Sequence, residues 1–291
     1  MYSPLLSTDS APEQTISLTY CHVIVRKERW VLTEENMPEA TNHRDATDLL
    51  KLILLAFVAR AGKNALVVAN LGCRWDVENP SFGVDPDIAL IEPVPPNAPP
   101  LSSLLTWKEG CVPPRFAVEI VSATNPNKDY LAAPAKYAAL GVGELVIFDP
   151  ELFGPAGADG PHVLQVWRRK GKGHFARVYA GVGPVWSAEL NAWLIHCEGK
   201  LRIADDFEGK VLWPTEAEAE AAARKREAAG RKREAEARAN AEDALRQSIE
   251  DMCDLCGVHL TTARREHIQA LDTPGLNQLR AHIKAHRNWP E

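Results

Sequence analysis

The sequence has no long apolar run and no excess of positive charge. None of its hydrophobic stretches reaches the roughly 20 residues of a membrane-spanning helix, and its first residues lack the apolar segment of a signal peptide. The formal net charge of -6 and the pI of about 5.9 exclude a protein that binds polyanions through a strongly basic overall surface. Any contact with nucleic acid must therefore depend on local charge.

Cysteine is scarce and scattered. The six cysteines form no compact disulfide pattern, so we expect a reduced, soluble protein of the cytoplasm. Cys253 and Cys256 form one CxxC that is followed by His259 and His267. Zinc modules show tighter spacing of their four ligands, and we expect no metal at these residues.

The chain is long enough for a substantial core, because 45% of its 291 residues are hydrophobic. Its composition changes along the sequence and predicts four parts. These are an N-terminal extension with a strand or hairpin (1–36), a central domain (37–212), a charged helix (213–250) and a small helical tail (251–291).

Helical and strand patterns alternate in the central domain, which predicts an α/β fold with one mixed sheet. Leucine and isoleucine recur at three- and four-residue intervals over 45–61, and Gly62 is placed to cap that helix. A second helix is expected over 131–140. Between 163 and 203, short apolar runs and glycine-rich turns predict a β-rich extension of the sheet. Strands of the sheet itself are expected at 65–68, 73–77, 88–91, 116–121 and 145–148.

Two acidic residues interrupt the apolar strands. Asp87 precedes the run Ile88–Ile91, and Glu119 lies within the run 116–121. A carboxylate in a strand that is buried on both faces carries a large desolvation penalty, so Glu119 needs a partner. A divalent cation shared with Asp87 would supply it, because magnesium takes carboxylate and carbonyl oxygens and leaves room for water and a substrate phosphate. Alternatively, Asp87 simply begins a strand, but Glu119 is harder to explain in that way.

Short motifs surround these two acids in a specific order. They consist of Pro38, Glu39, His43, Pro86, Asp87, Glu119, Ser122, Asp129, Tyr137, Gly141, Val142, Glu144, Asp149 and Pro150. Through them the chain resembles the Uma-two family of restriction endonucleases, a branch of the PD-(D/E)XK nuclease superfamily. The resemblance implies a restriction-endonuclease-like mixed sheet flanked by helices, and makes 37–212 the nuclease-like domain.

The resemblance also implies a function, that of a magnesium-dependent endonuclease that hydrolyses phosphodiester bonds in DNA, with manganese as an alternative metal. Asp87 and Glu119 would bind the metal, with the backbone carbonyl of Ile120 as a third oxygen. For His43, a histidine solvated near a helix start is an equally open reading. The residues implied to flank the site are Glu39, His43, Asp129 and Tyr137.

The sequence departs from the superfamily pattern at its lysine. Val121 stands two residues after the acid, where the superfamily has lysine, and Ala133 stands where many Uma-two relatives place one instead. Lys136 and Lys128 are the remaining candidates to orient a water or stabilise charge. Lys136 is three residues after Ala133 on the same helix, so its attachment point is shifted by roughly 4.5 Å along the helix axis. A lysine side chain can cover much of that distance, whereas Lys128 is in a turn, where its position is less fixed. We therefore expect Lys136→Ala to lower cleavage more than Lys128→Ala.

The unusual lysine leaves a second function open. A catalytically impaired protein could keep the nuclease fold and bind nucleic acid or a protein through its C-terminal helix. Substitution of Asp87 or Glu119 separates the two functions, because only an enzyme would lose cleavage while keeping its fold.

After Pro214 the sequence becomes almost entirely alanine, glutamate, arginine and lysine up to residue 247. Acid-first pairs four residues apart, each worth roughly 0.2 to 0.5 kcal/mol, predict a self-supporting helix. Alanines recur every seven residues, so a homo-oligomer through the 215–250 helix and a solvated single helix both stay open. The tail from Leu255 carries an apolar helical face and several basic residues. It is the best local candidate for phosphate contact, with a basic outer face of a small helical cap as the alternative.

Overall fold

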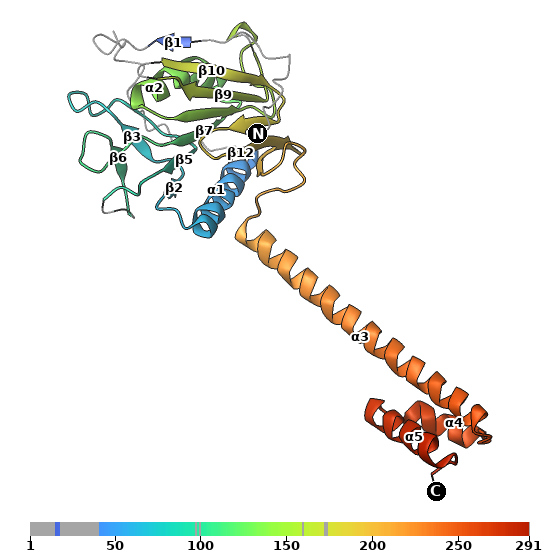
Figure 1. Cartoon of the computed structure of the whole chain (residues 1–291). Helices are drawn as coiled ribbons and strands as arrows, with labels where there is room; N and C mark the ends of the chain where they lie inside the picture. Colours follow the sequence, from blue (N-terminus) through green and yellow to red (C-terminus); the bar gives the residue numbers. More distant parts are fainter. Residues whose placement is uncertain are drawn as a thin grey trace. The chain divides into compact units, whose positions relative to one another are not determined.

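The computed structural model describes residues 15–17 and 41–290, apart from residues 97, 99, 159 and 172–173. Glu39, Pro38 and most of the expected N-terminal strand or hairpin lie outside these residues. The chain divides into two compact units, the first ending at Ala217 and the second beginning at Glu218 (Figure 1).

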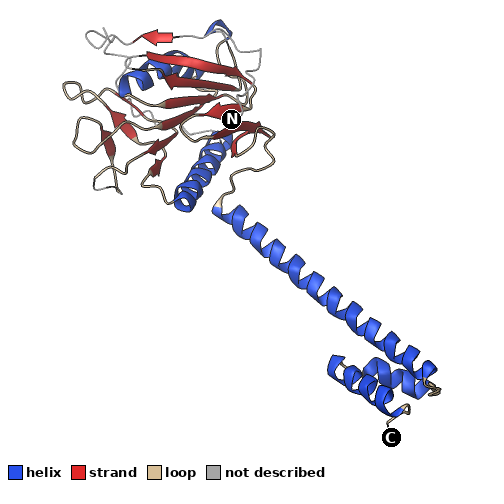
Figure 2. Cartoon of the chain, in the orientation of Figure 1, coloured by secondary structure: helices blue, strands red, loops and turns tan. Residues whose placement is uncertain are grey.

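The first unit is built on a seven-stranded mixed sheet with the order β1-β10-β9-β8-β7-β5-β2 (Figure 2). Within these described strands, β7 and β8 are the parallel pair, and all other neighbours are antiparallel. A parallel pair needs a crossover connection, which the helix before β8 provides. The strands are β1 (Thr15–Ser17), β2 (Leu66–Val68), β5 (Ile88–Ile91), β7 (Phe116–Ile120), β8 (Glu144–Phe148), β9 (Leu164–Arg169) and β10 (His174–Gly181).

Helices cover both faces of this sheet. On one face, α1 (Thr41–Ala61) buries a row of leucine and isoleucine side chains against Phe116 and Val118 of β7. The crossover consists of a π-helical turn, η2 (Lys128–Ala132), that continues into α2 (Ala133–Leu140). α2 packs on the opposite face, against alternate residues of β7 and β8. A 3-10 turn, η3 (Ala156–Ala158), follows β8.

Two three-stranded sheets complete the first unit. One has the order β4-β3-β6, formed by β4 (Gly83–Val84), β3 (Gly72–Arg74) and β6 (Ser103–Leu105). The other has the order β11-β12-β13, formed by β11 (Val185–Ser187), β12 (Ala192–Cys197) and β13 (Lys200–Ala204).

These sheets explain two differences from the expected strands. β9 and β10 extend the main sheet as expected, but β11 to β13 form a separate layer, because Leu194, Leu201 and Ile203 face the core beneath α1. The strand expected at 73–77 ends at Arg74 and belongs to a small sheet. The expected fold class is nevertheless confirmed: a mixed sheet flanked by helices, with a β-rich extension and a long charged C-terminal helix.

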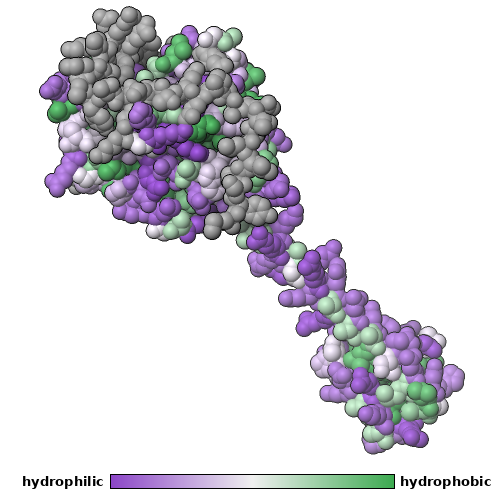
Figure 3. Space-filling view, turned by 45° about the horizontal axis from the view of Figure 1, so that its top comes forward, coloured by the Kyte–Doolittle hydropathy of each residue, from purple (hydrophilic) through white to green (hydrophobic). Residues whose placement is uncertain are grey.

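The second unit is helical, with α3 (Glu216–Leu255), α4 (Thr262–Ala270) and α5 (Thr273–His286). Most of α3 is exposed on all sides and hydrophilic (Figure 3), and the expected acid-first pairs include Glu227–Arg231 at 2.6 Å. Its C-terminal end packs with α4 and α5 around a core of Ile249, Cys253, Val258, Ile268, Leu276, Leu279 and Ile283. Among the described helices of the whole chain, none is both long and apolar enough to cross a membrane.

A core substitution should show whether the second unit unfolds independently. Leu276 is fully buried, so we expect Leu276→Ala to lower the free energy of unfolding of this unit by about 2 to 5 kcal/mol through the lost contacts and the cavity. Hydrogen exchange should rise across α4 and α5 and stay unchanged in β7 and β8. Leu255→Ala is the control, because Leu255 is 88% exposed. Equal loss of protection in both units would contradict the prediction.

Candidate active site

Asp87 and Glu119 lie side by side because β5 and β7 are antiparallel neighbours. Ile88 pairs with Val118, so the same register continued by one residue places Asp87 opposite Glu119. Residues that face each other in this way have Cβ atoms about 4.5 to 5.5 Å apart. Both side chains are buried, with exposed fractions of 7% for Asp87 and 3% for Glu119. Two carboxylates are therefore held together in a poorly solvated place.

The backbone of β7 and a histidine from α1 hold Asp87. Its Oδ2 atom accepts a hydrogen bond from the Ile120 amide at 2.6 Å. The Nε2 atom of His43 lies 3.2 Å from the same Oδ2 and 3.0 Å from the carbonyl oxygen of Ile120. His43 thus contacts two of the three groups that the sequence suggested as metal ligands, rather than being solvated at the start of the helix.

Glu119 points to the α2 face of the sheet and is held by two side chains. The hydroxyl of Tyr137 donates to Oε1 at 2.5 Å, and the Nζ atom of Lys128 lies 3.5 Å from Oε2. The pKa of Glu119 is raised to about 8, mainly by burial and also by the charges of Asp129 and Asp87, whereas Lys128 and the hydrogen bond from Tyr137 lower it. Without another cation, this carboxyl group keeps its proton at neutral pH.

The π-helical turn brings Lys128 and Asp129 to the site. The sequence predicted a helix from 131, but the helical turn begins three residues earlier, at Lys128. π-Helical turns insert an extra residue and occur frequently at functional sites. Asp129 is 2% exposed, and burial raises its pKa to about 7. Lys128 Nζ lies 3.4 Å from Asp129 Oδ1, so one ammonium group serves two acids, and the charge of Glu119 is the main cause that raises the pKa of Lys128.

Lys136 occupies a different position. It is half-buried, and burial followed by repulsion from Lys128 lowers its pKa. Within the described part of the chain it forms no ion pair, whereas Lys128 pairs with both Glu119 and Asp129. The π-helical turn thus places Lys128, and not Lys136, in contact with the carboxylates, and which lysine matters more for cleavage stays a prediction.

One nearby acid was missed by the sequence analysis. Asp85 lies two residues before Asp87, and desolvation raises its pKa, with the charge of Asp87 adding to the effect and that of Lys128 opposing it. Its signal in the sequence is only its position two residues before Asp87, and in the structure Asp85 is exposed whereas Asp87 is buried. The pair Asp85 and Asp87 could have been considered together.

Other residues of the motifs support the scaffold. Asp149 accepts hydrogen bonds from the Tyr130 hydroxyl and from the amides of Phe153 and Gly154, which fixes the loop after β8. Glu144 is fully buried and accepts from Arg168 Nε at 2.6 Å and from the hydroxyl of Ser187. Glu144 thus joins β8 to β9 and β11, and Asp149 holds the loop that follows β8.

The oxygens that could hold a divalent cation lie close together. Asp87 Oδ2 and the Ile120 carbonyl oxygen both contact one atom of His43, and Glu119 is opposite Asp87. Among the described residues, no three histidine, cysteine or acidic side chains form a metal-binding group, so the protein would supply two carboxylates and a carbonyl. This set fits magnesium, which leaves positions for water and a substrate oxygen. Asp87, Glu119 and Asp129 are buried beside one lysine, so their ionised forms would repel one another, and a cation would reduce that repulsion.

Comparison with known proteins gives a family for part of the chain. Residues 31–152 match the Uma2 family, which is described as "Putative restriction endonuclease". A crystal structure of a "putative nuclease belonging to DUF820" from Anabaena variabilis is similar at 14% identity and a TM-score of 0.38, over 55% of this chain and 78% of that chain. Among curated proteins, none matches the chain. The family match confirms the resemblance and supports a nuclease function, that is, a nucleic-acid-binding hydrolase of phosphodiester bonds.

The raised pKa of Glu119 predicts how stability depends on pH without metal. An unfolded Glu119 ionises near pH 4.5, whereas the folded one keeps its proton to about pH 8. Between these values the unfolded state binds fewer protons, so stability falls as the pH rises. We expect Glu119→Gln, which cannot ionise, to gain stability relative to the wild type over this window, measured by urea denaturation in EDTA. Glu109→Gln, at an exposed acid, is the control, and a parallel pH profile for Glu119→Gln would contradict the prediction.

Proposed function

We propose that the chain is a magnesium-dependent endonuclease, also active with manganese, that hydrolyses phosphodiester bonds in DNA. The observation that carries the proposal is the buried pair Asp87 and Glu119 on neighbouring strands, next to the Ile120 carbonyl, within the segment that matches the endonuclease family. Two acids and a carbonyl on neighbouring inner strands are the oxygen ligands that magnesium takes. When bound there, the metal would supply charge stabilisation at the phosphate and lower the pKa of a water.

The chain's own residues would prepare the site. Tyr137 fixes the orientation of Glu119 through its hydroxyl, and the Ile120 amide and His43 fix that of Asp87. Lys128 has an ammonium group beside Glu119 and half of its side chain exposed, so it can also reach a phosphate oxygen. Its positive charge would stabilise the charge that develops on the phosphate during hydrolysis.

Substitution of the acids tests the proposal directly. With magnesium or manganese we expect the wild type to cleave plasmid or single-stranded DNA, and EDTA to stop cleavage. Asp87→Asn and Glu119→Gln should lower the rate more than about 100-fold, because even partners that only orient a metal ligand are worth 10- to 100-fold. Calorimetry should show weaker magnesium binding, and circular dichroism should show an unchanged fold.

The control is again Glu109→Gln, which should cleave like the wild type. Cleavage at the wild-type rate by Glu119→Gln, or unaltered magnesium affinity, would contradict the proposal. RNA of the same sequence is the comparison for the substrate class. A folded wild type that binds nucleic acid but cleaves none would favour the alternative function, a binding module with a nuclease fold.

The lysine contacts lead to a separate prediction. We expect Lys128→Ala to lower cleavage by roughly ten- to a thousandfold, because it removes the charge nearest to Glu119. Lys136→Ala should have the smaller effect, since Lys136 pairs with no acid in the described residues. Single-turnover rates at saturating magnesium measure both. A larger loss of cleavage for Lys136→Ala than for Lys128→Ala would contradict this prediction. It would support the expectation from the sequence that Lys136 matters more.

The oligomeric state of the chain is a separate question from its proposed chemistry. A homo-oligomer through α3 stays a prediction from the sequence, because the exposed alanine seam of this helix suits either a coiled coil or a solvated helix. Nothing in the proposed chemistry requires a second copy, since Asp87, Glu119 and Lys128 all come from one chain.

A further inference from the structure

A cavity of about 430 Å³ lies next to the residues that hold Asp87, although neither Asp87 nor Glu119 lines it. Its inner wall includes His43 and Ile120, the two residues that contact Asp87. The other walls come from the loop after β8 and from the turn between β12 and β13. The size is within the range of small-molecule sites, and a group bound there would be next to the proposed reacting phosphate.

The walls of the cavity are largely apolar and include an aromatic ring on a fixed loop. Ala46, Val121 and Pro150 contribute apolar surface, and Phe153 is 42% exposed. The Phe153 amide donates to Asp149 Oδ1 at 2.9 Å, and the neighbouring amide of Gly154 donates to Oδ2 at 2.8 Å. The backbone that carries this exposed ring is therefore held in place before any ligand arrives, which lowers the entropy cost of ordering the loop on binding.

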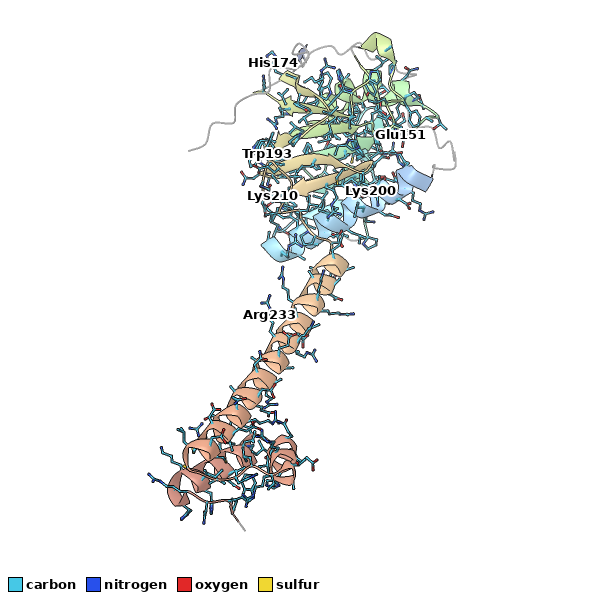
Figure 4. All side chains as sticks on the ribbon, turned by 90° about the vertical axis from the view of Figure 1, so that its right-hand side faces the viewer. Glu151, His174, Trp193, Lys200, Lys210 and Arg233 are labelled. Atoms are coloured by element: carbon cyan, nitrogen blue, oxygen red, sulfur yellow. The ribbon has the colours of Figure 1, made fainter. Side chains whose placement is uncertain are left out.

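The charges around the cavity decide what kind of group fits. The lining includes three acids, Asp45, Glu151 and Glu198, but a single lysine, Lys200. Glu151 and Lys200 lie on the same side of the unit, near the start of α1 (Figure 4). Three carboxylates disfavour a phosphate inside the cavity. They favour an uncharged planar group that offers N–H donors, because carboxylates accept hydrogen bonds from exocyclic amino groups of bases.

We propose that this cavity binds one unpaired nucleobase of the substrate, adjacent to the phosphate that Asp87 and Glu119 act on. The inference deepens the proposed nuclease function and rests on it. Phe153 would stack on the base, and the acidic rim would favour bases with an amino group. In a duplex both faces of a base are stacked on its neighbours and its Watson–Crick edge is paired, so the base must be in single-stranded nucleic acid or turned out of a duplex.

Lys200 then has a role at the mouth of the cavity. It is exposed, at the first position of β13, and it is the one lysine of the lining. A nucleotide whose base enters the cavity keeps its phosphate outside, where a lysine can approach it as a point charge. The three exposed acids and Lys200 would together set the direction in which the nucleotide enters.

The test compares binding to oligonucleotides by the full chain, with calcium in place of magnesium because calcium takes the same kind of oxygen ligands. One single-stranded DNA contains all its bases, and a set of variants lacks one base at each position in turn. Base stacking on an aromatic ring is lost in Phe153→Ala, so we expect affinity for the complete strand to fall by about 5- to 100-fold. Phe153→Tyr should restore it.

Phe207→Ala is the matched control, because Phe207 is 54% exposed and does not line the cavity. It should bind like the wild type. One strand of the abasic set lacks the base that would enter the cavity. Wild type and Phe153→Ala should bind that strand equally, because the base that stacks on the Phe153 ring is absent. Equal binding of the complete strand by wild type and Phe153→Ala, or a loss that persists with every abasic strand, would overturn the inference.

The same experiments separate this inference from the proposed function. A wild type that binds the strand through Phe153 but cleaves nothing in magnesium or manganese would contradict the nuclease function and leave the base site in place. Cleavage that is unaffected by Phe153→Ala, together with unchanged binding, would overturn the base site alone. A wild type that binds no oligonucleotide would overturn the base site as well.

Discussion

The buried carboxyl group of Glu119 is the constraint on which the rest of the site depends. β7 is covered by helices on both faces, so every polar atom on it needs a partner. Tyr137, Lys128 and a retained proton together make the burial tolerable in the absence of metal. The crossover between β7 and β8 supplies both partner side chains. The connection that the parallel pair requires is thus also the segment that completes the site.

The sequence predicted the two acids and their strands because these depend on short patterns. Apolar runs placed β5, β7 and β8 within a residue or two, and a carboxylate inside an apolar run is conspicuous in any sequence. Which of Lys128 and Lys136 contacts the acids could not be predicted in the same way. It depends on a π-helical turn, and one inserted residue changes which side chains face the sheet. Asp85 was missed because its environment is set by Lys128 and Arg74, which are distant in the sequence.

The second unit and the cavity illustrate the same division. α3 was predictable because its support is local, from pairs of opposite charge one helical turn apart. The cavity was not, because its walls come from α1, β7, the loop after β8 and the turn before β13. No short pattern reports that four such segments meet. The separate sheet of β11 to β13 brings Lys200 to the cavity, whereas the apolar runs of the sequence predict an extension of the main sheet there.

The acids of the site have two states, and the difference between them links stability to function. Without metal, burial and then repulsion from Asp87 raise the pKa values of Glu119 and Asp129 to about 8 and about 7, so both groups bind protons near neutral pH. A protonated carboxyl group is a poor ligand, so binding of a divalent cation must release protons and becomes stronger as the pH rises. The ion would also remove the repulsion that makes the metal-free site costly. A buried acid in an apolar strand is the kind of exception that is expected at a functional site. Glu119 lies within residues 31–152, the segment that matches the endonuclease family.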